Sequence, residues 1–203
     1  RHGWTRMAVF ASQHPAEFAQ GKVFRLEFEN LGGIVSFFAD PLPDATDLET
    51  EALRIVKSKP DAVFISNWWG VAPRALRTAG FTGPVLTRQM DQQRLEAAGE
   101  FLTRAYFPRY PKPTTVFQAK YFDKFKEAPP LYAATAYDIV RLYAHVREKT
   151  RTTDPARLQA AFAAATFQGA SGLIQFGRDR TVLTRSVEIA QIIGKDLDGP
   201  AVE

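Results

Sequence analysis

One short stretch near the middle of the chain, residues 59–70, most limits what this sequence can fold into. It contains the continuous apolar run Ala62–Ile65 and ends in two adjacent tryptophans, Trp68 and Trp69, before Gly70. A short apolar run without alternation is typical of a strand buried on both faces of a parallel sheet. Residues just beyond the carboxyl end of such a strand face the ligand crevice. The stretch therefore predicts a parallel sheet with two indoles at its ligand-binding edge. In the alternative, one ring caps the core and the other is half exposed.

Strand-like and helix-like segments alternate on both sides of this run. Pro15 is well placed as the first residue of a helix, whose expected apolar stripe is Phe18, Ala19, Val23 and Leu26. We expect strands at residues 7–11, 34–38, 62–65 and 84–87, with helices at 15–30, 48–56 and 73–79 between them. Successive strand–helix units in this order predict an α/β fold with a doubly wound parallel sheet and right-handed crossovers.

The pattern changes after residue 90, where the segments become less regular. We expect a short helix at 95–98, a strand at 101–107, a proline-rich hinge at 108–113, helices at 117–125, 131–149 and from 155, and strands at 169–177 and 187–193. On the long helix at 131–149, the residues expected to face inward are Ala134, Tyr137, Val140 and Ala144.

Three stretches resemble a known protein family in their order and spacing. Residues 61–79 hold a strand, an aromatic at its tip and a helix that ends before Gly80. Residues 132–138 are similar to an alanine-rich Tyr-Asp signature, and residues 167–176 to an "F-x-G-x-T-G-x-I-x-F" strand. The family is the branched-chain amino-acid (Leu/Ile/Val)-binding type of periplasmic solute receptor, the type I binding proteins of ABC importers. The resemblance implies two doubly wound lobes, joined by three crossings, with the ligand between them.

Compared with that family, the chain corresponds to unequal parts of the two lobes. Residues 1–110 and 185–203 resemble the second, C-terminal lobe, and residues 111–184 resemble the C-terminal part of the first lobe. We expect the N-terminal part of the first lobe, which in the family binds the ligand's carboxylate, to be absent. The chain also starts without an initiator methionine or a signal peptide, so we expect it to enter a fold already under way.

The resemblance places ligand-binding residues at five positions. They are His14 at the tip of the first strand, Trp68 with Trp69 at the tip of the central strand, Gln89 after the fourth strand, and Tyr132. Amino-acid binders of the family carry, at the position of Gln89, a glutamate that pairs with the ligand's ammonium group. Because a neutral amide makes no such charge-assisted bond, the expected ligand is an aromatic or unsaturated acid, or an amide. In the alternative, His14 is a polar strand end, Gln89 faces solvent and Tyr132 is a packing residue.

Several function classes are not supported by the sequence. The net charge of +4 comes from scattered Lys and Arg, so we expect no nucleic-acid partner. Without cysteine, the chain has no disulfide, thiolate metal site or cysteine nucleophile. It lacks the glycine-rich nucleotide motifs, the G-x-S-x-G elbow and H-E-x-x-H, and its three histidines are dispersed. We therefore expect no cofactor, no metal site and no enzymatic activity.

The resemblance implies a non-catalytic function. The expected protein is the periplasmic, exported solute-binding component of an ABC importer, which closes on a small ligand and delivers it to a membrane permease. Ligand contacts to both lobes would favour the closed state. The alternative is a ligand-sensing module of a regulator or receptor with the same fold.

Overall fold

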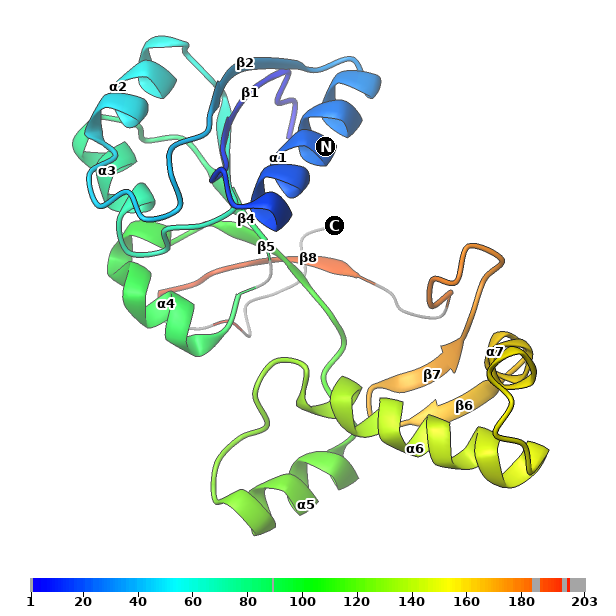
Figure 1. Cartoon of the computed structure of the whole chain (residues 1–203). Coiled ribbons are helices and arrows are strands. Elements are labelled where there is room, and N and C mark those ends of the chain that lie inside the picture. Colours follow the sequence, from blue (N-terminus) through cyan, green and yellow to red (C-terminus); the bar gives the residue numbers. More distant parts are fainter. Residues whose placement is uncertain (1, 89, 184–186, 195–196, 198–203) are drawn as a thin grey trace. The chain divides into compact units, whose positions relative to one another are not determined.

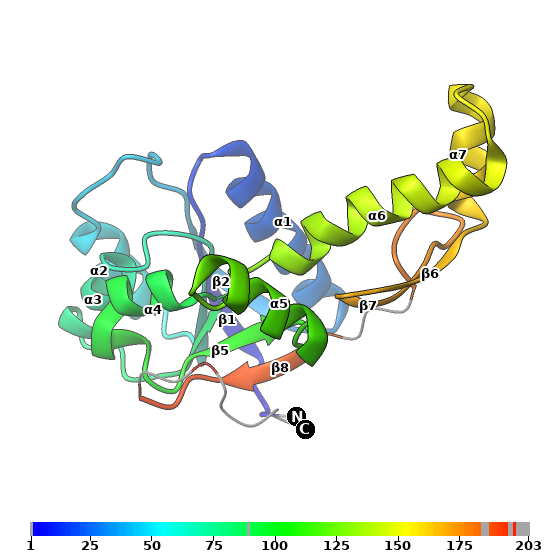
Figure 2. The same ribbon diagram turned by 90° about the horizontal axis from the view of Figure 1, so that it is seen from below.

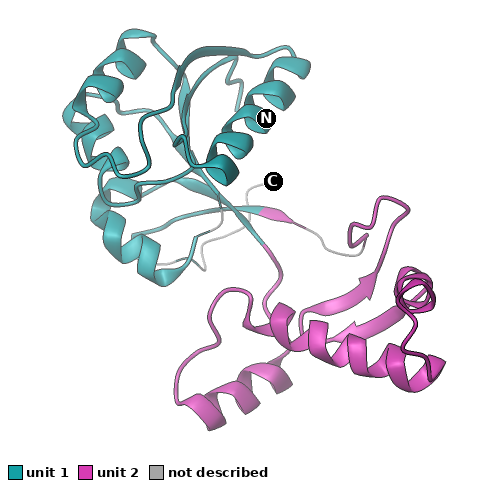
Figure 3. Cartoon of the chain, in the orientation of Figure 1, with its two compact units in different colours: residues 1–109, 189–203 teal, residues 110–188 magenta. Residues whose placement is uncertain are grey.

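The computed structural model describes residues 2–88, 90–183, 187–194 and 197. The chain divides into two compact units (Figure 3). Unit 1 comprises Arg1–Arg109 with Ile189–Glu203, and unit 2 comprises Tyr110–Glu188. The assignment of residues to the two lobes of the family stays a prediction. None of the helices in the described part of the chain combines the length and the apolar character that a membrane span requires.

Unit 1 is built on a six-stranded sheet with the strand order β2-β1-β3-β4-β5-β8 (Figure 1). The strands are β1 (Arg6–Phe10), β2 (Ile34–Ala39), β3 (Ala62–Ile65), β4 (Val85–Thr87), β5 (Tyr106–Arg109) and β8 (Glu188–Gln191). The pairs β1–β2, β1–β3, β3–β4 and β4–β5 are all parallel. This confirms the predicted α/β class with a doubly wound parallel sheet, in which β3 is a fully buried inner strand.

Helices cover both faces of this sheet (Figures 1 and 2). One face is covered by α1 (Pro15–Asn30), and the other by α2 (Glu49–Lys57), α3 (Ala72–Thr78), α4 (Gln92–Ala98) and the 3-10 helix η1 (Gly99–Leu102). Side chains of β1 alternate between the two cores: Phe10 packs with α2, α3 and α4, whereas Val9 packs with α1. The residues predicted as the start of a strand at 101 belong to η1 instead.

The buried face of α1 differs from the predicted stripe. Val23 and Leu26 are 58% and 57% exposed, and Gly21 is the buried residue of this helix. A Cβ added to Gly21 would lie 2.6 Å from the Cβ of Ala11, so the helix backbone lies directly on the sheet. Phe24 packs beside this point. The prediction was wrong for Ala19, Val23 and Leu26. The helix approaches the sheet closely through its glycine face, and a search for apolar side chains does not detect that face.

In its described residues, unit 2 contains three helices and a hairpin. The helices are α5 (Thr115–Phe125), α6 (Ala133–Thr150) and α7 (Pro155–Ala163), and the antiparallel strands are β6 (Thr166–Gly169) and β7 (Gly172–Gln175). The single strand predicted at 169–177 is thus part of a hairpin. α6 contacts both α7 and β6 (Figure 2).

The buried face of α6 centres on an acidic residue. The buried residues of this helix are Ala134, Asp138, Leu142 and Val146. Of the residues predicted to face inward, Ala134 is buried, whereas Tyr137, Val140 and Ala144 are exposed. The buried positions recur every four residues, and the prediction chose another face because it followed apolar character alone. Asp138 lies on this buried face and is 1% exposed, although its side chain is acidic.

Asp138 connects two of the stretches on which the family resemblance rests. Its Oδ1 accepts a hydrogen bond from the backbone N–H of Ala170 at 2.7 Å. Its Oδ2 accepts one from the backbone N–H of Ser171 at 2.7 Å and one from the Ser171 hydroxyl at 2.6 Å. A Cβ added to Gly169 would overlap the carboxylate. The Tyr-Asp signature and the "F-x-G-x-T-G" strand are therefore joined by hydrogen bonds, in which the carboxylate of the first stretch holds the β6–β7 turn of the second.

Candidate functional site

The carboxyl ends of neighbouring strands in unit 1 form the candidate site. In the sheet register, Phe10 of β1 pairs with Ile65 of β3, and Ile65 pairs with Thr87 of β4. The first residues beyond β3 and β4 are therefore Ser66 and Arg88, which are neighbours at the same edge. This is the edge at which open α/β sheets bind their ligands.

Buried donors without partners gather at this edge. In the part of the chain that the structure describes, three side-chain atoms are buried with no hydrogen-bond partner: Ser66 Oγ, Trp68 Nε1 and Arg88 Nε. Ser66 is fully buried and Trp68 is 8% exposed. A buried donor without a partner costs about 1–3 kcal/mol, and native proteins contain few of them. Three such atoms at the ends of two adjacent strands are the groups at this edge that could bind the acceptor atoms of another molecule.

Trp68 is held in an unusual backbone conformation. Its φ is 55°, in the left-handed region that bulky residues rarely adopt. Its carbonyl oxygen accepts hydrogen bonds from the N–H groups of Val71 and Ala72, both at 2.9 Å, so the turn leads directly into α3. The indole lies in the core, with its ring centroid 5.7 Å from that of Phe10. Strain of this kind persists where the surrounding structure enforces it and is concentrated at functional sites.

Gly70 fixes the position of the two tryptophans relative to α4. A Cβ at this position would lie 2.8 Å from the carbonyl oxygen of Ala97. That oxygen belongs to the helix backbone and cannot move aside as a flexible side chain would. The turn that carries Trp68 and Trp69 is therefore in direct contact with α4 through a position that only glycine fits.

Replacing Gly70 by alanine is expected to destabilise unit 1, because the added methyl group must displace the Ala97 carbonyl. The expected loss in the free energy of unfolding is about 1–3 kcal/mol, as for other overpacked positions. Urea denaturation followed by tryptophan fluorescence measures it, with Val71→Ala at the adjacent, more exposed position as the control. An unchanged denaturation midpoint in Gly70→Ala would show that the turn does not touch α4.

Two guanidinium groups lie close to the ring of Trp69. The guanidinium carbons of Arg88 and Arg94 are 5.5 Å and 5.9 Å from its ring centroid. Arg94 also forms an ion pair with Asp91 at 2.9 Å, which anchors it at the start of α4. Cation–π contacts of this kind favour a fixed position of both the ring and the cations. Half-buried Trp69 thus helps to orient Arg88 at the site.

A small polar network continues the site toward α1. The buried hydroxyl of Ser12 donates a hydrogen bond to Glu17 and accepts one from the backbone N–H of His14 at 3.1 Å. The other carboxylate oxygen of Glu17 lies 3.6 Å from Arg88 Nη2, a distance too long for a strong hydrogen-bonded pair. Glu17 therefore orients Arg88 without occupying its buried Nε–H.

The structure brings three of the five predicted site residues to one unit. His14 is exposed at the start of α1, Trp68 is buried, and Trp69 is half-buried beside it. Tyr132 belongs to unit 2, where it precedes α6 and is 56% exposed. Gln89 lies outside the described residues. The burial of Trp68 and the partial exposure of Trp69 match the alternative in which one indole caps the core. The ligand contacts of all five residues stay predictions.

Sequence reasoning missed Ser66 and Arg88. Each is the first residue after a predicted strand, and that position is the signal that would have identified it. Among the described residues, no group of three or more His, Asp or Glu side chains is arranged to hold a metal ion.

Comparison with known proteins places the chain in a family. A family profile described as "Periplasmic binding protein" matches residues 1–196. The chain belongs to this family, in agreement with the resemblance noted in its sequence, and its fold is that of the type I periplasmic binding proteins. No curated protein sequence matches the chain.

Solved structures share this fold at low sequence identity. A leucine-binding protein from Thermotoga maritima has a TM-score of 0.81 and 20% identity, over 99% of this chain and 61% of that one. A branched-chain amino-acid-binding protein from Streptococcus pneumoniae, in complex with isoleucine, has a TM-score of 0.78 and 17% identity, over 100% and 61%. A solute-binding protein from R. palustris, in complex with benzoate, has a TM-score of 0.77 and 17% identity, over 98% and 60%. The chain spans about three fifths of the length of these proteins.

Proposed function

We propose that this protein is the solute-binding component of an ABC importer, periplasmic and non-catalytic, which captures a small ligand between two lobes. The ligand would then pass to a membrane permease. Membership of the periplasmic binding protein family supports this role, and solved relatives with this fold are ABC transporter binding proteins. The observation that carries the proposal is the set of three unpaired buried donors beyond β3 and β4.

The chemistry of these donors favours a ligand rich in acceptor atoms. The indole N–H of Trp68 and the Nε–H of Arg88 can only donate hydrogen bonds, and the Ser66 hydroxyl can both donate and accept them. A carboxylate or an amide carbonyl accepts from several donors at once, and the charge of Arg88 strengthens its bond to a carboxylate. Trp69 beside them is half-buried and packs against the core, so the exposed part of its ring would contact an apolar group of the ligand. We therefore propose a small carboxylate or amide ligand with an aromatic or unsaturated part.

The test uses the indole N–H resonances of the 203-residue protein, which contains three tryptophans. Benzoate, benzamide and L-leucine are titrated at millimolar concentration, and Trp68→Phe assigns the Trp68 signal. We expect benzoate and benzamide to shift the Trp68 resonance saturably, and leucine to shift it less. Trp4 precedes β1, at the opposite end of the strand from Ser12, and serves as the internal control.

Two outcomes of this titration would contradict the proposal. Tighter binding of leucine than of benzoate would overturn the ligand class. Absence of a saturable shift of Trp68 with all three probes would overturn the site.

A further inference from the structure

Glu17 places a carboxylate beside the guanidinium group of Arg88 at the candidate site. Glu17 lies in the first turn of α1, and its Oε1 is 3.6 Å from Arg88 Nη2. The side chain of Glu17 is 12% exposed and that of Arg88 is 30% exposed, so solvent and salt screen the two charges less than on an open surface. A ligand group that reaches Arg88 therefore also meets a negative charge.

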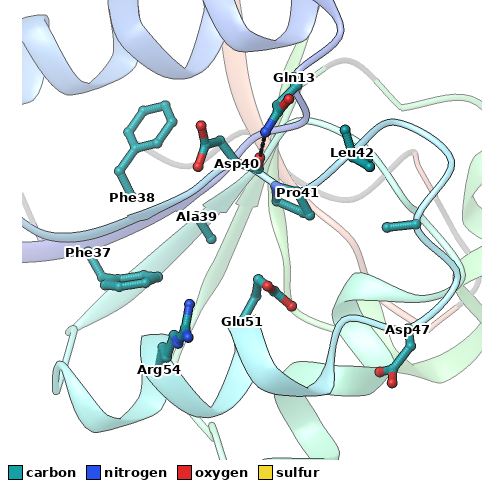
Figure 4. Close-up of a pocket in the computed structure, with 11 residues that line it drawn as sticks. Gln13, Phe37, Phe38, Ala39, Asp40, Pro41, Leu42, Asp47, Glu51 and Arg54 are labelled. Atoms are coloured by element: carbon teal, nitrogen blue, oxygen red, sulfur yellow. Dashed lines mark hydrogen bonds between the residues drawn. The ribbon is translucent and has the colours of Figure 1, made fainter.

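The carboxylate of Glu17 is held in place from its other side. Its Oε2 accepts a hydrogen bond from the buried hydroxyl of Ser12, which in turn accepts one from the backbone N–H of His14 at 3.1 Å. The Gln13 amide donates to the carbonyl oxygen of Asp40 at 2.8 Å, which ties the segment between β1 and α1 to the end of β2 (Figure 4). If the carboxylate moved away, the buried hydroxyl of Ser12 would lose its acceptor, which is costly.

The second guanidinium group at the site also has a carboxylate partner. Arg94 lies close to the ring of Trp69, as Arg88 does, and forms an ion pair with Asp91 at 2.9 Å. The two guanidinium groups and their two carboxylates together carry no net charge. A carboxylate ligand would gain from Arg88, be repelled by Glu17 and lose its hydration on entry, so little of the electrostatic gain would remain.

A neutral amide group avoids this repulsion. Its carbonyl oxygen accepts up to two hydrogen bonds, and Trp68 Nε1, Arg88 Nε and Ser66 Oγ are buried at this edge without partners. The NH₂ group of a primary amide also has hydrogens to donate, and a carboxylate such as that of Glu17 is a strong acceptor for them. An amide therefore matches both the donors and the acceptor of the site.

We propose that Glu17 makes this site select neutral amides over carboxylates. The inference rests on the function proposed above and narrows its ligand class to a small primary amide with an aromatic or unsaturated part. The carbonyl oxygen of the ligand would accept hydrogen bonds from Arg88 and Trp68, and its NH₂ group would donate one to Glu17.

The test measures the dissociation constants of benzamide and benzoate, two probes of similar shape, from the Trp68 indole resonance of the 203-residue protein. The unchanged protein should bind benzamide about threefold more tightly than benzoate, or better. In Glu17→Gln, the ratio of the two constants should shift about tenfold in favour of benzoate, because Arg88 then has no carboxylate beside it.

The control is the same substitution at another position of α1. Glu27 is exposed and lies two and a half turns further along the helix, so Glu27→Gln should leave the ratio unchanged. Glutamine has the shape of glutamate and keeps an oxygen that can accept from Ser12, so Glu17→Gln is expected to fold. Any loss of structure would weaken both probes alike, and their ratio would not report it.

The outcomes separate this inference from the proposed function. An unchanged ratio in Glu17→Gln, or tighter binding of benzoate than of benzamide by the unchanged protein, would overturn selection by Glu17 and leave the site beyond β3 and β4 intact. No shift of Trp68 with either probe would overturn that site and the selection together. Amide shifts confined to residues 37–54 would place the probes in the cavity between β2 and α2, shown in Figure 4, and would overturn both as well.

Discussion

Asp138→Ala is expected to be the most destabilising single substitution in unit 2. The carboxylate accepts three hydrogen bonds at 2.6–2.7 Å, from Ala170 and from the backbone and hydroxyl of Ser171, and the side chain is 1% exposed. Removing it leaves buried donors without a partner, each of which costs about 1–3 kcal/mol. We expect the free energy of unfolding to fall by about 3 kcal/mol or more, measured by chemical denaturation.

The matched control is Asp123→Ala in α5. Asp123 pairs with Lys126 on the surface, and its side chain is 89% exposed, so its loss should change stability by less than about 0.5 kcal/mol. Hydrogen exchange gives an independent measurement, because the amides of Ala170 and Ser171 should lose their protection in Asp138→Ala. Denaturation of Asp138→Ala at the midpoint of the unchanged protein would show that the carboxylate does not hold the turn.

Asp138 also shows what the sequence could and could not predict about unit 2. The Tyr-Asp signature and the glycine-rich strand were both recognised, but as separate resemblances. They are connected by hydrogen bonds from Ala170 and Ser171 to Asp138, which lies 32 and 33 residues earlier in the chain. A local sequence pattern does not reveal a contact between residues so far apart. For the same reason, the buried face of α6 was misplaced onto Val140.

Unit 1 was easier to predict, because its strands are continuous apolar runs between glycine and proline boundaries. The doubly wound parallel sheet followed from the alternation of strands and helices and from the right-handed crossover rule. The position of α1 did not follow, because a glycine that allows close contact with the sheet is not an apolar signal. Local composition therefore predicted the elements, and steric fit decided which faces they bury.

The candidate site was predicted in part for a related reason. Two adjacent indoles at a strand end stand out in any sequence, and Trp68 and Trp69 were identified from them. Ser66 and Arg88 are common residues in a polar stretch, and only the register of β3 with β4 and their burial make them significant. Whether a buried side-chain donor lacks a hydrogen-bond partner depends on the folded structure, so the amino-acid composition does not predict it.

Trp68 carries the second large prediction, which rests on the proposed function. In Trp68→Ala, the affinity for benzoate should fall more than tenfold, which corresponds to about 1.4 kcal/mol or more. The reason is that the variant loses both the indole N–H and the ring that packs beyond the carboxyl end of β3. Trp68→Phe keeps most of the ring and removes the donor, so its loss should be smaller. The measurement is the dissociation constant of benzoate, from calorimetry or from the amide resonances.

The burial of Trp68 requires a test of folding beside the test of binding. The ring is 8% exposed and packs on Phe10, so truncation to alanine leaves a cavity and is expected to cost about 3–5 kcal/mol of stability. Binding is therefore compared only under conditions in which circular dichroism shows each variant folded, with Trp4→Phe as the control far from the site. If folded Trp68→Phe and Trp68→Ala both bind benzoate as tightly as the unchanged protein, Trp68 is a core residue alone. A graded loss, larger in alanine than in phenylalanine, would mean that the strained turn after β3 holds an indole whose N–H contributes to binding and whose ring contributes to the core.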